Sequence, residues 1–317
     1  MKIILDLDTG IDDALAIAYA LGEEKAEILA ITSVFGNIDV RQASMNAAYT
    51  LQLLQHQHIP VYKGVEHSLD TTYYEQKKGS KICHGENGYG NLEVEHTSFC
   101  EDMSAVDFLI EAANTYKSEL TIVATGPLGN IAAAIQKDKK AMTQIKQLVI
   151  MGGAFGVRGN ISAVAEANFA HDAQAADIVL RSGIPVIMIG LDVTLRTLLT
   201  REDICEWKQY GKAGNVYRDL VEYYIQAYET FNPHLKGCAL HDPLAVGVAL
   251  NPSLVSTYPL CLQVMTDKES LGRVVIDKEA MSNGTPRTCH VALDVDAQAF
   301  KKRMLQCIEN VFQNLTN

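Results

Sequence analysis

Short runs rich in isoleucine, valine and leucine alternate along this chain with longer alanine-rich segments whose apolar residues recur at helical spacing. This alternation is typical of βα units that build a mostly parallel sheet. The pattern therefore predicts an α/β fold in which helices flank a mostly parallel central sheet. The predicted strands lie near residues 2–6, 27–33, 120–124, 147–151 and 185–190.

The C-terminal part of the chain shows a different pattern. The stretches YPLCLQVMTD and GRVVIDK predict an antiparallel pair of strands, and AQAFKKRMLQCIENVFQNL predicts a closing helix. The sequence contains no repeat, low-complexity tract or linker. Because α/β chains of this length often form one domain around a single sheet, we expect residues 1–317 to be a single domain.

Two segments interrupt the βα rhythm. Residues 62–99 contain the glycine-rich stretch KKGSKICHGENGYGNLE, and a long loop of this kind is usually a lid or a disordered excursion. Residues 208–241 are rich in aromatic side chains, namely Tyr210, Tyr217, Tyr223, Tyr224, Tyr228 and Phe231. We interpret the first segment as a lid-like insertion and the second as a helical segment.

Glycine and small polar residues follow each predicted strand, in the stretches DLDTGIDD, TSVFGNID, ATGPLGN, MGGAFGVRGN and GLDVT. Ligands of open α/β sheets bind outside the carboxyl ends of the strands. These turns are therefore expected to form the functional edge of the sheet.

The first of these turns is crowded with carboxylates. Asp6, Asp8, Asp12 and Asp13 fall within eight positions, and carboxylates a few ångströms apart raise one another's pKa unless a cation or many donors compensate. Helix capping by Asp12, with solvated neighbours, would account for one or two of these residues but not for Asp8. Oxygen ligands without a paired histidine or cysteine indicate a hard cation, Ca²⁺ or Mg²⁺.

The charge and cysteine content of the chain indicate what kind of molecule it binds and where it is found. The chain has 27 Lys and Arg against 38 Asp and Glu, a formal net charge of −11, whereas nucleic-acid binding relies on clustered basic side chains. The seven cysteines include no CxxC pair, which favours a reducing cytosol. Neither a leader nor an apolar run near the roughly 20 residues of a membrane helix is present. We therefore expect a soluble cytoplasmic protein that binds a small molecule, not nucleic acid or a membrane.

The order of several motifs resembles the inosine-uridine preferring nucleoside hydrolase family. These motifs are DLDTGIDDALA, FGN at 35–37, ATGPLGNIAAA at 124–134, VIMGGAFGVRGNISAVAEANFAHD at 149–172 and LHDPLAV at 240–246. The resemblance runs from about residue 3 to residue 296. It implies a Rossmann-like nucleoside hydrolase fold, a tightly bound Ca²⁺, and hydrolysis of the N-glycosidic bond of ribonucleosides to ribose and free base.

The resemblance also implies a metal site and a general base. Ca²⁺ would be held by Asp8, Asp13, the backbone carbonyl of Thr125 and Asp242, with a water and ribose hydroxyls completing its shell. Asp12 would take the proton of the attacking water. Ca²⁺ accepts roughly six to eight oxygens, so protein, water and a sugar diol fit around it together.

Four further residues match positions that bind the ribose hydroxyls in the family, namely Asn37, Asn160, Glu166 and Asn168. Asn37 and Asn160 follow glycines in predicted turns, where asparagine is common for conformational reasons alone. Met151 ends a predicted strand and either lines the pocket or belongs to the core.

The resemblance places other residues beside the departing base. His241, next to Asp242, would donate a proton to it, and His84 in the 62–99 segment would approach it. Tyr224, Tyr228 and His234 would form the leaving-group wall, although such aromatics also occur as ordinary helix core. If the 62–99 segment is a lid, residues 74–84 are expected to be open or poorly ordered without a ligand.

The sequence departs from the family pattern at Ala167, where an aromatic residue often forms part of the pocket wall. The expected specificity is broad or pyrimidine-leaning, with substrates such as uridine, cytidine and inosine. The expected assembly is a homo-oligomer, either a dimer or a tetramer.

Two alternatives from other classes remain open. A metal-dependent phosphatase of the haloacid dehalogenase type also ends its first strand in Asp-x-Asp, but it normally has Thr or Val where this chain has Gly10. A catalytically silent nucleoside-binding protein is the other alternative, and the presence of Asp12, Asp13 and His241 argues against it.

Overall fold

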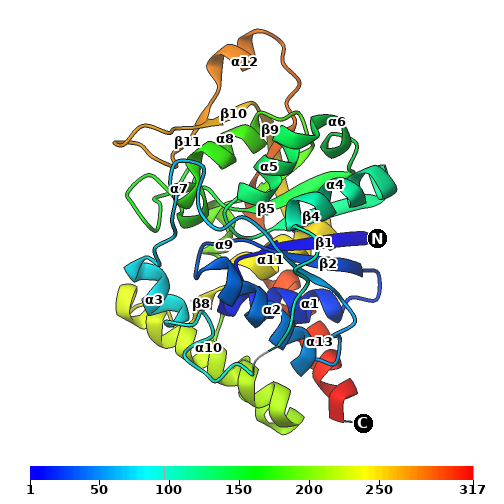
Figure 1. Ribbon diagram of the computed structural model, residues 1–317. Helices are drawn as coiled ribbons and strands as arrows, with labels where there is room; N and C mark the ends of the chain where they lie inside the picture. The colour runs from blue at the N-terminus through cyan, green and yellow to red at the C-terminus, as the bar shows by residue number, and fades with distance from the viewer. Residues whose placement is uncertain (96, 317) are drawn as a thin grey trace.

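The computed structural model describes residues 1–95 and 97–316, and it is built around one large sheet (Figure 1). The eight strands of this sheet follow the order β3-β2-β1-β4-β5-β6-β12-β9. Neighbouring strands are parallel throughout, except that β9 runs antiparallel to β12 at the edge. The predicted mostly parallel α/β sheet is thereby confirmed.

The strands of the main sheet are β1 (Lys2–Leu7), β2 (Glu27–Ser33), β3 (Val61–Lys63), β4 (Leu120–Ala124), β5 (Gln147–Met151), β6 (Val186–Ile189), β9 (Val255–Leu260) and β12 (Cys289–Val295). Two small antiparallel pairs are formed by β7 (Leu198–Leu199) with β8 (Cys238–Ala239) and by β10 (Leu262–Val264) with β11 (Val274–Ile276).

The helices are α1 (Ile11–Leu21), α2 (Val40–Leu53), α3 (Lys78–His84), α4 (Ala105–Tyr116), α5 (Gly129–Lys137), α6 (Lys139–Met142), α7 (Ala167–His171), α8 (Ala173–Leu180), α9 (Leu191–Thr194), α10 (Gly211–Phe231), α11 (His241–Leu250), α12 (Lys278–Ser282) and α13 (Ala297–Thr316). Short 3-10 turns lie at Lys117–Glu119, Trp207–Tyr210 and Pro252–Leu254. Within the part of the chain that the structure describes, no helix combines the length and the apolar character needed to span a membrane.

All five strands predicted from apolar runs are present, and the predicted C-terminal helix is α13. The predicted C-terminal strand pair is β10 with β11, but the residues just before it belong to β9 of the main sheet. The apolar pattern missed β9 because three of its central residues, Ser256, Thr257 and Tyr258, are exposed at the sheet edge. It also missed β3 and β12, of which β3 has only three residues.

Helices cover both faces of the sheet, with α1, α2 and α13 on one face and α4, α5 and α8 on the other (Figure 1). Side chains of β1 point alternately to the two faces of the sheet, so Ile3 and Leu5 pack into one hydrophobic core and Ile4 packs into the other. Helix α1 is buried over nearly its whole length, which explains why its sequence is apolar on all sides after the first turn, which carries Asp12 and Asp13.

The strand order indicates where along the sheet a ligand is expected to bind. From β1 the sheet grows in one direction through β2 and β3, and from β4 it grows in the other direction through β5 and β6. Ligands of doubly wound sheets bind where this direction reverses, outside the carboxyl ends of the strands. That point lies between β1, which leads to Asp8, and β4, which leads to Thr125.

Candidate active site

The turn after β1 is locked by its own aspartate. Gly10 caps α1, and its N–H donates to Asp13 Oδ2 at 2.7 Å. The other oxygen of Asp13 accepts a hydrogen bond of 2.7 Å from the hydroxyl of Thr125, which follows β4. Asp13 therefore ties together the two strand ends at the switch point.

Two glycines allow side chains to approach this turn closely. A Cβ added at Gly10 would lie 2.6 Å from Nδ1 of His84 and 2.9 Å from Nδ2 of Asn37. A Cβ added at Gly36 would overlap Oδ2 of Asp8. Glycine is thus required sterically at both positions.

Four buried aspartates gather at this point, and we call Asp8, Asp12, Asp13 and Asp242 the carboxylate cluster. None is more than 4% exposed. Asp12, Asp13 and Asp242 each bring one oxygen within 4.8 Å of the others. Asp242 joins from the first turn of α11, far away in the sequence.

Two oxygens of the cluster lack a partner. Asp8 accepts the N–H of Asn37 at 2.7 Å through Oδ2, but its Oδ1 accepts no hydrogen bond from the described residues. Oδ1 of Asp12 is likewise buried without a partner among them. Buried polar atoms are normally hydrogen-bonded, so these two oxygens indicate an additional positive group.

The raised pKa values of the cluster also indicate a missing positive group. Burial raises the pKa of Asp8 and Asp242 well above the usual carboxyl value, and the neighbouring aspartates add to the effect. Burial also raises the pKa of Asp13, and it raises the pKa of Asp12 to about 7. An oxygen-only donor set of this kind fits a hard cation, which would restore the ionised forms.

The three carboxylates that lie closest together are not the three that were predicted as Ca²⁺ ligands. The close oxygen triplet contains Asp12 in place of Asp8. Asp8 is nevertheless part of the same charge network, because Asp13 and Asp12 both raise its pKa. Asp6, the fourth carboxylate of the β1 stretch, is not part of it and instead accepts hydrogen bonds from Thr32 and Asn130.

Asn168 supports the backbone beside the cluster. Its Nδ2 donates to the carbonyl oxygen of Thr125 at 2.6 Å and to that of Met151 at 3.1 Å. Both amide hydrogens are therefore engaged, and the Oδ1 atom remains for another donor. Met151 is buried at 3% exposure and its sulfur lies 3.5 Å from the same amide, so this residue belongs to the core and also contacts Asn168.

Glu166 is buried and caps α7. Its carboxylate accepts the N–H groups of Gly153, Asn168 and Phe169. Asn160, predicted as a ribose ligand, is exposed, and its Oδ1 accepts the N–H of Ala167 at 3.0 Å. Its side chain therefore does not join the buried residues of the site.

A group of rings adjoins the cluster, and we call His84, Tyr224, Tyr228 and His241 the ring wall. The hydroxyl of Tyr224 donates to Oδ2 of Asp12 at 3.3 Å, and the ring of Tyr228 lies edge-on to Tyr224 with 5.1 Å between centroids. The His84 ring lies 5.2 Å from that of Tyr224. The long helix α10 thus places two tyrosine rings beside Asp12, the predicted general base.

Both histidines of the ring wall are buried. Nδ1 of His84 accepts the N–H of Ile11 at 3.2 Å, which makes that nitrogen the unprotonated one. In His241, Nε2 lies 2.6 Å from the hydroxyl of Tyr228 and Nδ1 lies 2.8 Å from Oγ1 of Thr194. Burial lowers the pKa of His84 to about 3 and that of His241 to about 4, so both imidazoles are neutral near pH 7.

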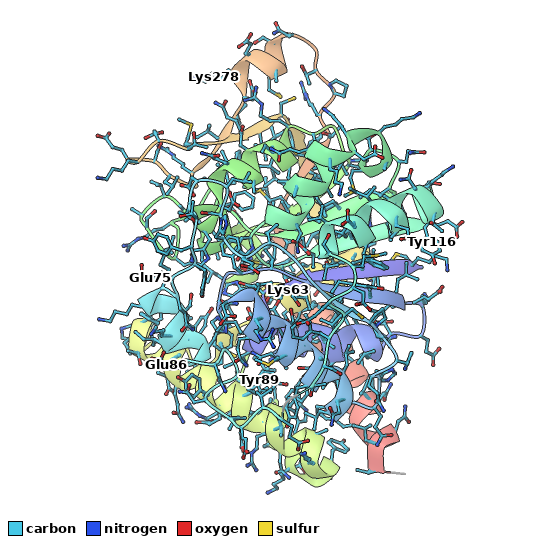
Figure 2. The ribbon with its side chains drawn as sticks, viewed as in Figure 1. Lys63, Glu75, Glu86, Tyr89, Tyr116 and Lys278 are labelled. Atoms are coloured by element: carbon cyan, nitrogen blue, oxygen red, sulfur yellow. The ribbon has the colours of Figure 1, made fainter. Side chains whose placement is uncertain are left out.

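The expectation of an open 74–84 segment is wrong for this structure. The hydroxyl of Tyr74 donates to the carbonyl of Gly36 at 3.0 Å, and Gln76 donates to the carbonyl of Asn37 at 2.9 Å. These bonds hold the segment against the turn beside Asp8, and α3 delivers the buried His84. Figure 2 shows Glu75 and Glu86 on either side of α3, next to α10. Position 96, within the predicted 62–99 insertion, lies outside the described residues.

His234 is not part of the ring wall. Helix α10 ends at Phe231, and His234 lies exposed in the turn that follows. Thr194, in contrast, was missed by sequence reasoning although it contacts His241. The only signal for it was its place in GLDVT, one of the small polar turns after a predicted strand.

Comparisons with known proteins agree with this geometry. The family model described as inosine-uridine preferring nucleoside hydrolase matches residues 3–302. A probable uridine nucleosidase 2 of Arabidopsis thaliana is 34% identical over 96% of this chain and 96% of its own length. The inosine-uridine preferring nucleoside hydrolase of Crithidia fasciculata is 31% identical over 98% of both chains.

A solved structure extends the similarity to the fold. The purine-preferring ribonucleoside hydrolase from Gardnerella vaginalis superposes with a TM-score of 0.96 at 44% identity, covering 99% of this chain and 100% of that chain. The chain therefore belongs to the inosine-uridine preferring nucleoside hydrolase family and is an enzyme that acts on N-glycosyl compounds.

Proposed function

We propose that this enzyme hydrolyses both purine and pyrimidine ribonucleosides in a Ca²⁺-dependent reaction. The observation that carries the proposal is the carboxylate cluster, in which Oδ1 of Asp8 and Oδ1 of Asp12 have no partner among the described residues and Asp12 contacts the ring wall through Tyr224. Relatives named for uridine and a similar structure named for purines support a broad base range. The pyrimidine preference considered from sequence is the narrower form of this proposal.

The proposed ligands of Ca²⁺ are Asp8, Asp13, Asp242 and the carbonyl oxygen of Thr125. When bound, the ion supplies positive charge that keeps the carboxylates ionised and polarises a water. Asn168 supports this arrangement from the protein side, because its amide fixes the position of the Thr125 carbonyl. Asp13 is fixed in turn by the Thr125 hydroxyl and the Gly10 N–H.

Asp12 is the proposed general base. One of its oxygens accepts the Tyr224 hydroxyl, and the other has no partner among the described residues and is free to take a proton. The attack of water at the anomeric carbon would pass through an oxocarbenium-like transition state, whose positive charge the carboxylates stabilise.

Asn37, Asn168 and Glu166 are proposed to orient the ribose. Asn168 has only its Oδ1 left to accept from a sugar hydroxyl, and Asn37 lies close to Gly10 at the turn. All three Glu166 bonds come from backbone N–H groups, so this residue also holds the loop in shape. Asn160 would need a rotation of its side chain to reach the sugar.

The ring wall is proposed to receive the nucleobase. Burial keeps both histidines neutral, so His84 would act toward the departing base as a hydrogen-bonding group, while His241, whose two nitrogens are bonded to Tyr228 and Thr194, would act through Tyr228. Residues 62–99 would act as a lid that opens for substrate entry and excludes water when closed. Residues 208–241 would provide the aromatic side of the pocket.

We further propose a single domain of residues 1–317, a homo-oligomeric assembly and a cytoplasmic location. All seven cysteines are free, which is compatible with a reducing compartment.

A substrate panel tests the proposal. Release of reducing sugar is measured with uridine, cytidine, inosine, adenosine and a phosphate ester, with Ca²⁺ and after chelation. The proposal expects turnover of several nucleosides that disappears with chelation and returns with Ca²⁺. Binding without turnover would indicate a silent binder, and turnover of the ester alone would indicate a phosphatase.

A further inference from the structure

His241 is held between two hydroxyl groups. Its Nε2 lies 2.6 Å from the hydroxyl of Tyr228, and its Nδ1 lies 2.8 Å from Oγ1 of Thr194. Thr194 is fully buried, and neither His241 nor Tyr228 is more than 8% exposed. Water therefore does not compete for these two bonds in the described structure.

The backbone fixes Thr194 relative to His241. Thr194 ends the short helix α9, and its carbonyl accepts the hydroxyl of Thr197 at 2.9 Å. The carbonyl of Thr197 accepts the N–H of Leu240 at 2.9 Å, one residue before the histidine. Strands β7 and β8 pair next to this contact. The distance between the threonine hydroxyl and the imidazole is therefore set by the fold.

A neutral imidazole between two hydroxyls has two possible hydrogen-bond directions. If Thr194 donates to Nδ1, the hydrogen of His241 is on Nε2 and points to the oxygen of Tyr228. The hydroxyl hydrogen of Tyr228 is then available to another acceptor. If Nδ1 carries the hydrogen, Tyr228 must donate to Nε2, and its hydrogen is no longer available.

The surroundings of Thr194 favour the first direction. Among the described residues, His241 is the hydrogen-bond partner found for Thr194 Oγ1. In the second direction the hydrogen of Thr194, which is 0% exposed, would have no acceptor, and an unsatisfied buried donor is unfavourable. In the first direction the hydrogen left over is that of Tyr228, which is 8% exposed and lines the proposed base pocket, where a substrate can accept it. The hydrogen bond from Thr194 to Nδ1 thus determines the tautomer of His241, because the partner of one ring nitrogen decides whether the other nitrogen carries the hydrogen.

We propose that Thr194 is a positioning residue that orients the Tyr228 hydroxyl hydrogen toward the departing nucleobase, through the Nε2–H tautomer of His241. This inference rests on the proposed function. As the bond between C1′ and the base nitrogen breaks, its electron pair stays on the base, where the Tyr228 hydrogen bond stabilises the developing charge. The oxygen of water bonds to C1′, Asp12 takes the water's proton, and that proton passes through solvent to the released base.

Replacement of Thr194 tests the proposal because valine keeps the shape and removes the donor. The probes are a ribonucleoside that the wild type cleaves and p-nitrophenyl riboside, whose leaving group needs no hydrogen bond. For Thr194→Val we expect kcat on the nucleoside to fall roughly tenfold to a hundredfold, with KM within about twofold. Activity on the p-nitrophenyl riboside should stay within about twofold of wild type, and Thr194→Ser should restore the nucleoside reaction.

A matched control comes from another buried threonine. Thr121 on β4 has a hydroxyl without a partner among the described residues, so Thr121→Val removes the same atoms away from His241. This variant should keep wild-type kinetics on both substrates. In a Tyr228→Phe background, Thr194→Val should cause no further loss, because both changes remove the same hydrogen bond to the base.

Two results would overturn the inference. Equal losses on the nucleoside and the p-nitrophenyl riboside would show a merely structural role for Thr194, and an unimpaired Thr194→Val would show no role. If the wild type cleaves neither substrate, the proposed function itself fails and the inference fails with it.

Discussion

The carboxylate cluster and the ring wall adjoin each other, but they differ in charge and in how completely their polar atoms are bonded. In the cluster, Asp8 and Asp12 each have a buried oxygen that finds no partner within residues 1–95 and 97–316, and burial raises the pKa of all four aspartates. In the ring wall, both nitrogens of His241 and Nδ1 of His84 have partners within the chain. The cluster is therefore incomplete without a cation, whereas these three ring nitrogens are already bonded within the chain.

Because of this difference, we expect the carboxylate cluster to depend on bound metal and the ring wall to be independent of it. An ionised carboxylate without compensation is expensive to bury, so metal binding should control the shape and stability of the cluster. The ring wall consists of neutral groups from α3, α10 and α11, and it should keep its geometry with or without metal. Mutations on the two sides should accordingly differ in their metal dependence.

The largest expected effect follows from Asp12→Asn. The amide keeps the size of the side chain but cannot accept the water's proton, so kcat should fall by roughly 10²- to 10⁴-fold. Calcium titration should show affinity close to wild type if Asp12 lies outside the coordination shell. A large loss of affinity would instead make Asp12 a ligand, as its close approach to Asp13 and Asp242 would allow.

Asp242→Asn should act mainly on metal binding. The change removes one negative oxygen ligand and one of the charges that repel within the cluster, so Ca²⁺ should bind more weakly and raise the thermal midpoint less. Titration calorimetry and thermal unfolding with and without Ca²⁺ measure both quantities. Asp6→Asn is the matched control, because this buried carboxyl faces Thr32 and Asn130 and should leave metal affinity unchanged.

The pH dependence of stability should reveal the cluster when metal is absent. Because the folded-state pKa values are raised above the unfolded value of roughly 4, the protonated carboxyls favour the fold. This stabilisation is fully present below the unfolded pKa and is lost as pH rises through the folded pKa, which is about 7 for Asp12 and is also raised for the others. Over the same pH range the two histidines of the ring wall, whose pKa burial lowers, act in the opposite direction, because they bind more protons in the unfolded state, and they do so with or without metal.

We therefore expect the thermal midpoint of the metal-free enzyme to fall, relative to that of the Ca²⁺-saturated enzyme, as pH rises from about 4 through about 7, the folded-state pKa of Asp12. The loss of stability is up to about 1.4 kcal/mol per pH unit for each carboxyl that is still protonated in the fold. Saturating Ca²⁺ should remove most of this dependence, because it keeps the carboxylates ionised. Thermal midpoints that vary equally with pH in both conditions would contradict a metal role for the cluster.

The same contrast explains what could be predicted from sequence. Asp8, Asp12 and Asp13 lie within one strand-turn-helix unit, so local pattern alone places them at the sheet edge. The strands next to them are buried apolar runs, which is why the centre of the sheet was also predictable. Asp242 was assigned by resemblance, since nothing local brings α11 to the turn after β1.

The ring wall depends on contacts between distant segments. Thr194 and His241 are 47 positions apart, and a threonine in a short turn carries no signal for the histidine that it faces. The docking of residues 74–84 was mispredicted because its anchors are the polar groups of Tyr74 and Gln76, not aliphatic side chains. The position of His234 outside the ring wall could not be foreseen either, because aromatic content does not show where a helix ends, and α10 ends before it.

The smallest expected effects distinguish the two remaining histidine candidates of the base side. His84 is buried, lies with its ring tilted 5.2 Å from that of Tyr224 and accepts the N–H of Ile11 at the start of α1, so His84→Ala removes both the proposed base contact and support for the turn beside Asp12. We expect it to lower kcat on a nucleoside by roughly tenfold, near the lower end of what one hydrogen-bonding group contributes. His234 is exposed beyond the end of α10, so His234→Ala should change kcat and KM by less than about twofold. Steady-state kinetics with the same nucleoside measure both variants. A loss in His234→Ala as large as that in His84→Ala would mean that the turn after α10 moves into the pocket when substrate binds, and the ring wall would then have to include it.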